Sequence, residues 1–340
     1  MLVATTCAAA SFLLATFLAG RIRRYAIDHA ILDIPNQRSS HTEPTPRGGG
    51  LAIALTAVLG MLLVDASPLG SDSASVLAIA AGGSLVAAIG WFDDVRGVTP
   101  LVRIAVHLIA AVVAVYGMGG FDRVQLGTST VDLAFAGPVV AILAIVWSTN
   151  LFNFMDGIDG LAAAEAISVS TAGGILLLAT GSMELGIISL IVAGAAAGFM
   201  LWNWPPARLF MGDAGSGFFG FALGCLAVES EKATRVQALV WMVLMGVFIT
   251  DATVTLVRRM MRGEALYKAH RSHAYQRLVA AGWTHRRVTS TVAAFNIWLA
   301  IVCALIVAYP TWTLSLVIGA VCFLTAAYFA VERSAPMHSR

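Results

Sequence analysis

Acidic and amide side chains recur at a regular short spacing in one apolar segment of the chain. Asn150, Asn153, Asp156 and Asp159 follow one another every third residue in the stretch TNLFNFMDGIDGLA. On a helix, neighbours three apart lie on the same side, so adjacent members of this series can converge on one ligand. Carboxylate, amide and phosphate oxygens are the usual surroundings of Mg²⁺, which takes few protein ligands. The alternative is a polar turn between two helices, with Asp159 as an N-cap.

Three further acids lie at the ends of apolar runs. Asp93 and Asp94 close a long run, where the dipole of a helix is already negative and each acid costs about 0.3 to 1 kcal/mol. A bound cation or solvent must offset that cost. Asp213, in FMGDAGSG, is placed equally well to cap a helix or to act as a ligand, since a helix N-terminus also favours phosphate.

Basic residues gather in two polar loops. His270 and His273 lie three apart in the most basic loop, with Arg271 and Arg277 alongside, and this pattern favours the binding of an anionic group. Zinc is disfavoured because no third histidine or cysteine is near. The first polar loop offers an acid and two arginines before a run of three glycines, which allows a binding role, although such arginines are also typical of topology signals and lipid contacts: Asp33, Arg38 and Arg47.

Membrane-spanning helices must position these residues. The chain of 340 residues is 59% hydrophobic and 12% charged, with a mean hydropathy of +0.83, whereas soluble domains carry about 25% charged residues. We predict one all-α polytopic membrane domain over residues 1–340. About eleven apolar stretches are long enough to be transmembrane helices, at residues 2–20, 50–66, 74–92, 101–118, 135–152, 161–180, 184–201, 215–229, 236–257, 288–309 and 312–331.

The basic residues orient these spans. If the N-terminus is outside, nearly all of the 21 lysines and arginines fall in loops on the other side, so the positive-inside rule predicts a periplasmic N-terminus and a cytoplasmic C-terminus. Every polar cluster described above then falls on the cytoplasmic side. We therefore expect a one-sided site at the bacterial inner membrane, built from loops at about 21–49, 93–100, 150–160, 202–214 and 258–287.

Acids for a divalent cation and bases for phosphates, beside a bilayer that can hold a lipid, suggest phosphoryl transfer involving a membrane-bound substrate. Such catalysis consists mostly of positioning and charge neutralisation. Ion-coupled transport is the alternative, because acids in a membrane protein often mark ion paths. Transporters place such groups near the bilayer midplane, whereas these acids lie at the inner ends of spans.

Five motifs in this order resemble the polyprenyl-phosphate N-acetylhexosamine-1-phosphate transferases of glycosyltransferase family 4. They are DIPNQRSSHTEPTPRGGG, FDDVRG, NLFNFMDGIDGLA, FMGDAGS and HRSHAYQRL, and they cover about residues 30 to 280. The family includes the peptidoglycan translocase and the enzymes that start O-antigen, enterobacterial common antigen and teichoic acid synthesis. The resemblance implies that undecaprenyl phosphate attacks the β-phosphorus of a UDP-N-acetylamino sugar on the cytoplasmic leaflet. The products are undecaprenyl-diphospho-sugar and UMP, with Mg²⁺ or Mn²⁺ as cofactor.

The resemblance also implies roles for individual residues. Asp213 matches the metal-binding acid, with Asn153 as its companion. The catalytic acids are Asp93, Asp94, Asp156 and Asp159. The expected substrate-binding residues are Asp33, Arg38, Arg47, Asn150, His270, Arg271 and His273.

The histidine motif departs from the translocase pattern, which has a run of adjacent histidines, and from the H-x-H-H of the common-antigen branch. His270-Arg-Ser-His273 disfavours muramoyl-pentapeptide as the sugar and favours the O-antigen or capsule initiating branch, a step of lipopolysaccharide synthesis. N-acetylglucosamine, N-acetylfucosamine and N-acetylquinovosamine stay open. Direct attack and a covalent aspartyl-phosphate route also stay open, although a lipid phosphate with a second pKa near ~6 is largely dianionic and favours direct attack. We expect membrane lipid but no nucleic acid as a partner, and a homodimer is compatible with the family.

Overall fold

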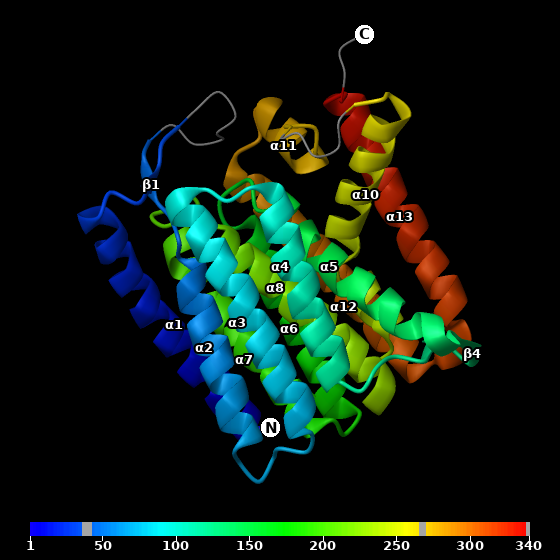
Figure 1. Ribbon diagram of the computed structural model, residues 1–340. Helices are drawn as coiled ribbons and strands as arrows, with labels where there is room; N and C mark the ends of the chain where they lie inside the picture. The colour runs from blue at the N-terminus through cyan, green and yellow to red at the C-terminus, as the bar shows by residue number, and fades with distance from the viewer. Residues whose placement is uncertain (36–42, 265–269, 338–340) are drawn as a thin grey trace.

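The computed structural model describes residues 1–35, 43–264 and 270–337, so Arg38 lies outside the described residues. The described chain is a bundle of long helices with two small hairpins (Figure 1). The first half of the bundle contains α1 Leu2–Asp28, α2 Gly50–Asp65, α3 Ser73–Arg96, α4 Pro100–Gly117, α5 Gly137–Met155, α6 Leu161–Ala179 and α7 Met183–Asn203. The second half contains α8 Asp213–Ala233, α9 Ala238–Leu244, α10 Gly246–Met261, α11 Ala274–Ala280, α12 His285–Ala308 and α13 Thr313–Ser334.

The all-α polytopic class is confirmed, and each predicted span coincides with a helix or a pair of helices. Within the described residues, eight helices are long and apolar enough to cross a membrane. The predicted span 236–257 is the pair α9 and α10, which is bent by 77° and would be a ninth crossing if it counts as one span. The apolar helix α2 is shorter, with 16 residues, and α8 is not among the eight. The figure of eleven crossings therefore stays a prediction.

Helix α8 is the centre of the bundle. Almost every side chain from Ala214 to Glu231 is buried, including Phe218, Phe219 and Phe221, and α8 packs on α2, α3 and α5. A helix that is apolar on all sides is expected in such a place. The close approach of α2 depends on glycine, because a Cβ on Gly50 would lie 2.0 Å from the backbone nitrogen of Gly215.

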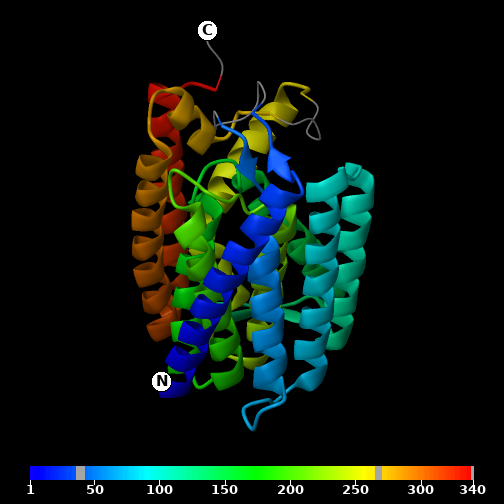
Figure 2. The same ribbon diagram turned by 90° about the vertical axis from the view of Figure 1, so that its left-hand side faces the viewer.

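The polar loops meet at one end of the bundle, which we call the site end. It contains the hairpin of β1 Leu32–Asp33 and β2 Thr45–Pro46, whose antiparallel register pairs Asp33 with Thr45. The second hairpin, β3 Arg123–Leu126 and β4 Ser129–Asp132, joins α4 to α5 at the opposite end. The N-terminus also lies at that opposite end, whereas the last helix, α13, ends at the site end (Figures 1 and 2). This arrangement agrees with a first helix that starts and a last helix that ends on opposite sides of a membrane, while the side that each faces stays a prediction.

We expect Gly50→Ala to lower the free energy of unfolding by about 1 to 3 kcal/mol, because the added methyl group would force α2 away from the backbone of α8. The measurement is the thermal unfolding midpoint in detergent. The matched control is Gly319→Ala on α13, where a Cβ would meet no atom within 4 Å. Equal midpoints for the two variants would contradict the proposed contact.

Candidate active site

The last turn of α3 and the first turn of α8 meet through the buried side chain of Asp94. Its Oδ1 accepts a hydrogen bond from the Asp213 backbone N–H at 3.1 Å, and its Oδ2 accepts from the Ala214 N–H at 3.5 Å. Asp94 thus caps α8 from a neighbouring helix, and the positive end of the α8 dipole offsets the cost of an acid at the end of α3.

The predicted cap of α8 is corrected by this arrangement. The N-cap position belongs to Gly212, and Asp213 is the first helical residue with its side chain directed elsewhere. Gly212 has φ of 72°, and a Cβ there would lie 2.2 Å from Asp94 Oδ2. Only glycine fits this position, so Gly212 is required by the way in which Asp94 reaches the helix.

Arg103 on α4 joins two of the predicted acids. Its Nη1 donates to Asp93 Oδ2 at 2.7 Å and also to Asp213 Oδ2. The three side chains are 18–27% exposed, so the pairing is neither fully buried nor fully solvated. Sequence reasoning counted Arg103 only as a topology charge. Its place near the start of an apolar span, ten residues after the acid pair, is the signal that could have marked it.

Asn153 comes close to α8 by another route. Its Nδ2 donates to Ser216 Oγ at 3.3 Å, and Ser216 lies three residues after Asp213 on the same helix. The predicted neighbour Asn150 is turned to its own helix, where its Nδ2 donates to the Val146 carbonyl at 2.7 Å. The structure therefore brings Asn153, but not the amide nitrogen of Asn150, to the start of α8.

The expected helical register of Asp156 and Asp159 is wrong, because α5 ends at Met155 and both acids lie in the following loop. Glycine disfavours helix, and this loop contains two glycines, one of which is the N-cap of α6. Asp159 joins two other segments instead. Its Oδ2 accepts from the Ala207 N–H at 3.0 Å and lies 3.3 Å from His285 Nδ1.

Asp156 has a strongly perturbed carboxyl group. Burial raises its pKa to about 7, and the negative charges of Asp94 and Asp159 add to the effect. The positive charges of Arg103 and of Arg47, which follows β2, act on the carboxylate of Asp94. One electrostatic environment is therefore shared by Asp93, Asp94, Asp156 and Asp159 with Arg47 and Arg103, and all of them except Arg103 were predicted as site residues.

The donor set can be tested against a divalent cation. Within residues 1–35, 43–264 and 270–337, no group of three histidine, cysteine or acidic side chains is placed to hold a metal ion. Arg103 occupies Oδ2 of Asp213 and leaves Oδ1, while the donating amide of Asn153 leaves its carbonyl oxygen as an acceptor. The residues fit a cation such as Mg²⁺, which completes its octahedron with water and substrate phosphates.

The two predicted histidines are neighbours in space, with ring centroids 4.9 Å apart. Burial lowers the pKa of His270 to about 4, and the neighbouring His273 and Arg259 add to the effect. Its Nδ1 accepts from the Ser272 N–H at 3.3 Å, so a neutral His270 carries its proton on Nε2. His270 can donate a hydrogen bond to an anion, but at neutral pH it does not offer the positive charge that was expected.

Residues 270–277, which we call the histidine segment, are held in place by a buried acid that sequence reasoning missed. Asp251 on α10 accepts from the Ala274 N–H at 2.7 Å and from the Tyr275 N–H at 3.1 Å, and His273 Nδ1 lies 3.5 Å away. Tyr275 in turn donates to the Phe154 carbonyl at 3.1 Å, next to the loop of Asp156. A lone acid within an apolar span is a signal that could have found Asp251.

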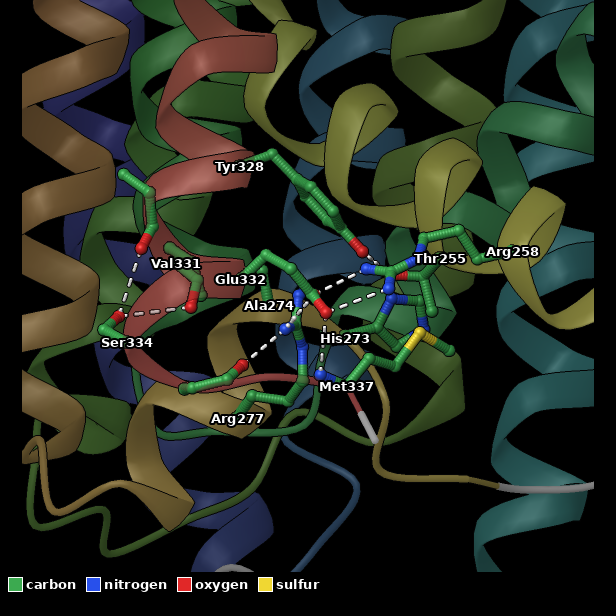
Figure 3. A network of polar contacts seen from close by, with 12 residues as sticks. Thr255, Arg258, His273, Ala274, Arg277, Tyr328, Val331, Glu332, Ser334 and Met337 are labelled. Atoms are coloured by element: carbon green, nitrogen blue, oxygen red, sulfur yellow. Dashed lines mark hydrogen bonds and ion pairs between the residues drawn. The ribbon is translucent and has the colours of Figure 1, made fainter. Parts of the chain in front are cut away.

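The other end of the histidine segment is anchored to the last helix (Figure 3). Glu332 on α13 binds Arg277 of α11 at 2.7 Å and forms two hydrogen bonds to Arg258 of α10, at 2.5 and 2.9 Å. Arg277 also donates to the Ala335 carbonyl and stacks over Tyr328. Arg277 was expected to hold an anion beside the histidines, and the structure corrects this, because its buried guanidinium is bound to Glu332 instead.

The remaining predicted residues lie at the rim of this site. Asp33 is on β1. The chain after β2 is hydrogen-bonded to the segment before α8, because the backbone N–H groups of Gly49 and Gly50 donate to the carbonyls of Phe210 and Met211. These hydrogen bonds bring the first loop with Arg47 beside the start of α8. Arg271 is exposed next to His270, and nothing in the structure tests its predicted role.

An apolar cavity of about 330 Å³ lies behind the loop of Asp156. Helices α10, α11, α12 and α13 form its walls, and Met155 and Leu161 border it on either side of that loop. Asp251 and Tyr275 lie at its polar edge, and both are already hydrogen-bonded. Other lining residues are Val247, Trp283, Val292, Phe295, Leu324 and Val331.

Comparisons with known proteins agree on one family. Residues 76–231 match the model of glycosyl transferase family 4. A probable undecaprenyl-phosphate N-acetylglucosaminyl 1-phosphate transferase of Bacillus subtilis is 30% identical over 78% of this chain and 74% of its own length. A decaprenyl-phosphate N-acetylglucosaminephosphotransferase of Mycolicibacterium smegmatis is 32% identical over 84% and 77%. A phospho-N-acetylmuramoyl-pentapeptide-transferase of Moorella thermoacetica is 34% identical, over 58% and 62%.

We expect Asp94→Ala to lower the free energy of unfolding by about 1 to 3 kcal/mol, because two backbone N–H groups at the start of α8 lose their acceptor. Asp94→Asn retains an acceptor oxygen and should cost less. Thermal unfolding midpoints in detergent measure both, with the exposed Asp28→Ala as control. Asp94→Ala as stable as that control would refute the capping role.

We expect His270 to make the folded protein less stable in acid. Its pKa of about 4 in the folded chain lies below the ordinary value of about 6.5, so the unfolded state binds the extra proton between these values. The stability contribution is complete above pH 6.5 and is lost as the pH falls towards 4. His270→Gln should therefore weaken the fall in unfolding midpoint between pH 7 and pH 4.5. The exposed His29→Gln serves as control, and identical pH profiles for His270→Gln and the wild type would contradict the assignment.

Proposed function

Because this chain belongs to glycosyl transferase family 4, we propose that it transfers an N-acetylamino-sugar 1-phosphate from a UDP-sugar to undecaprenyl phosphate. The products are undecaprenyl-diphospho-sugar and UMP, and the reaction is the first membrane step of a cell-envelope polysaccharide. The observation that carries the proposal is the meeting of Asp93, Asp94, Asp213 and Arg103 at the start of α8, at one end of a multi-pass helical bundle. Ion-coupled transport receives no support from relatives that are named as transferases.

N-acetylglucosamine is the sugar that we propose. Two relatives named for N-acetylglucosamine are 30% and 32% identical over 78% and 84% of this chain, whereas pentapeptide transferases that cover a comparable share of it, 79% and 82%, are 27% and 28% identical. The separated histidines of His270-Arg-Ser-His273 support the same choice, since they depart from the run of adjacent histidines of the translocase branch. We further propose that the product feeds O-antigen or a related surface polymer.

The proposed site works by positioning and charge neutralisation. Asp213 Oδ1 and the Asn153 carbonyl would hold Mg²⁺ or Mn²⁺, which when bound neutralises phosphate oxygens of the UDP-sugar. Arg47 and Arg103 supply positive charge on the same side, and His270 Nε2–H donates to a phosphate or sugar oxygen. In the reaction, an oxygen of the lipid phosphate forms a bond to the β-phosphorus. The bond from the β-phosphorus to the bridging oxygen breaks, and UMP leaves with that oxygen.

We propose direct attack by the lipid phosphate, and the contacts of the two acids of α3 support this route. A covalent route needs a carboxylate with a free lone pair directed at phosphorus. Asp94 accepts two backbone hydrogen bonds, and Asp93 accepts from Arg103 and from the Val98 N–H. Groups engaged in this way are poor nucleophiles, and a dianionic lipid phosphate does not need a general base.

The apolar cavity behind the loop of Asp156 suits the first part of the lipid chain. It starts one residue from Asp156, at Met155, and its walls are formed mainly by apolar side chains of α10, α12 and α13. A prenyl chain that occupies it would emerge among helices long enough to cross the membrane, while its phosphate would face the acids. We place the site end on the cytoplasmic side of the inner membrane, where the positive-inside rule puts the arginine-rich loops.

We expect the purified protein with undecaprenyl phosphate and Mg²⁺ to release UMP from UDP-N-acetylglucosamine, and not from UDP-N-acetylmuramoyl-pentapeptide. Asp213→Asn and Arg103→Gln should each lower kcat by about 100-fold or more, because each removes a charge that acts on the reacting phosphates. EDTA should abolish turnover, and added Mg²⁺ should restore it. The control Asp28→Asn should keep wild-type kcat, since this exposed acid lies at the end of α1.

Two outcomes would overturn the proposal. Folded protein that releases no UMP from any UDP-N-acetylamino sugar would refute the transferase activity. Wild-type turnover of Asp213→Asn, or in excess EDTA, would refute the metal role while leaving the reaction class in place.

A further inference from the structure

Arginines stack on tryptophans where α7 ends and α12 begins. The guanidinium carbon of Arg208 lies 5.0 Å from the ring centre of Trp202, and that of Arg286 lies 6.0 Å from the ring of Trp204. Both arginines and Trp204 are exposed. Planar guanidinium groups held over indole rings keep their N–H donors at the edge of the group, and Arg208 uses one of them, on Nη2, for the Leu201 carbonyl at 3.0 Å.

The end of α1 continues the same surface. Arg23 Nε donates to the Arg208 carbonyl at 3.1 Å, and Trp202 Nε1 donates to the Thr16 carbonyl at 3.1 Å. We call Arg23, Arg208 and Arg286, with Trp202 and Trp204, the arginine-tryptophan border. Figure 2 views the face along which α1 runs, with α12 and α13 on one side of it and α3 and α4 on the other.

Three helices long and apolar enough to cross a membrane end at this border. They are α1, α7 and α12, so their ends mark one boundary between the bilayer and water. Tryptophan is enriched at that depth because its ring is apolar and its N–H is polar. The border therefore lies at the level of lipid headgroups rather than in water above them.

The charges of the border differ from those of other arginines at the site end. Arg103, Arg258 and Arg277 are each bound to a carboxylate. Within the described ranges, no ion pair joins Arg23, Arg208 or Arg286 to an acid, and their neighbours are aromatic rings and carbonyl groups. Three positive charges on adjacent segments, without acidic partners, form a surface complementary to phosphate groups.

We propose that the arginine-tryptophan border binds the headgroup phosphates of anionic phospholipids in the adjacent leaflet. The tryptophans set the depth of the protein in the leaflet, and the arginines select negative headgroups, as clustered basic residues beside a span do in general. The proposal does not rest on the transferase reaction. The border is also linked to the loop of Asp156 through Asp159. The carboxylate of Asp159 accepts from the N–H of Ala207, which precedes Arg208, and lies beside His285, which precedes Arg286.

The test uses the full chain in a neutral detergent, with phosphatidylglycerol or phosphatidylcholine added at equal molar ratios. We expect phosphatidylglycerol to raise the thermal unfolding midpoint of the wild type, as a ligand that binds the folded state does. The triple variant Arg23→Gln, Arg208→Gln, Arg286→Gln should lose at least half of that rise. Arg333→Gln, an exposed arginine in the last turn of α13, is the matched control and should retain it. Native mass spectrometry should show correspondingly fewer bound phosphatidylglycerol molecules on the triple variant.

A second variant separates charge from stacking. Arg208→Lys keeps the charge but loses the planar group that lies over Trp202, so it should retain only part of the rise in midpoint. An equal rise for the triple variant and the wild type would overturn the proposal. A rise of the same size with phosphatidylcholine would also overturn it, because the site would then bind any phospholipid. A rise of the same size with glycerol 3-phosphate at the same concentration would assign the site to free phosphate. Loss of undecaprenyl phosphate binding with phosphatidylglycerol binding intact would assign the border to the substrate instead.

Discussion

The hydrogen bonds from the first residues of α8 to Asp94 are the constraint on which the site depends. A helix that starts inside a bundle must have acceptors for its first N–H groups, and an acid at the end of another helix must have a positive environment. The carboxylate of Asp94 supplies the acceptors, and the N–H groups at the start of α8 supply the positive environment. The same contact fixes α3 against α8, and with it the positions of Asp93 and Asp213, which Arg103 then joins.

The acids around this junction differ in their burial, in their partners and in their protonation. Asp94 is buried and committed to backbone groups, Asp93 and Asp213 share one arginine, and Asp156 remains with a pKa raised to about 7. Carboxylates that are partly neutralised in this way leave room for a cation without a preformed cage of protein ligands. In the proposed function, the metal ion would therefore bind together with the substrate phosphates.

The sequence predicted the helical class, the positions of the long helices and the convergence of the acids, because hydropathy can be read residue by residue and alternate spans end on the same side. It did not predict which acid would do what. Asp94 and Asp213 each read as an acid at the end of a helix, and only the crossing of α3 and α8 shows that one caps the other helix. The three-residue spacing of Asp156 and Asp159 suggested a helix, but the two glycines of this loop end it at Met155. Arg103 joins Asp93 to the distant Asp213, and Asp251 acts on a segment 23 residues away, and spacing along one segment cannot reveal such partners.

The bridge from Glu332 to Arg258 and Arg277 makes the last helix part of the site, although no motif lies beyond about residue 280. Helix α13 acts as a brace that joins α10 to the short helix that carries the histidine segment (Figure 3). The motif-bearing part of the chain is therefore not a self-sufficient unit. A chain ended before residue 332 would keep every signature by which the family is recognised, yet its histidine segment would lose one of its two supports.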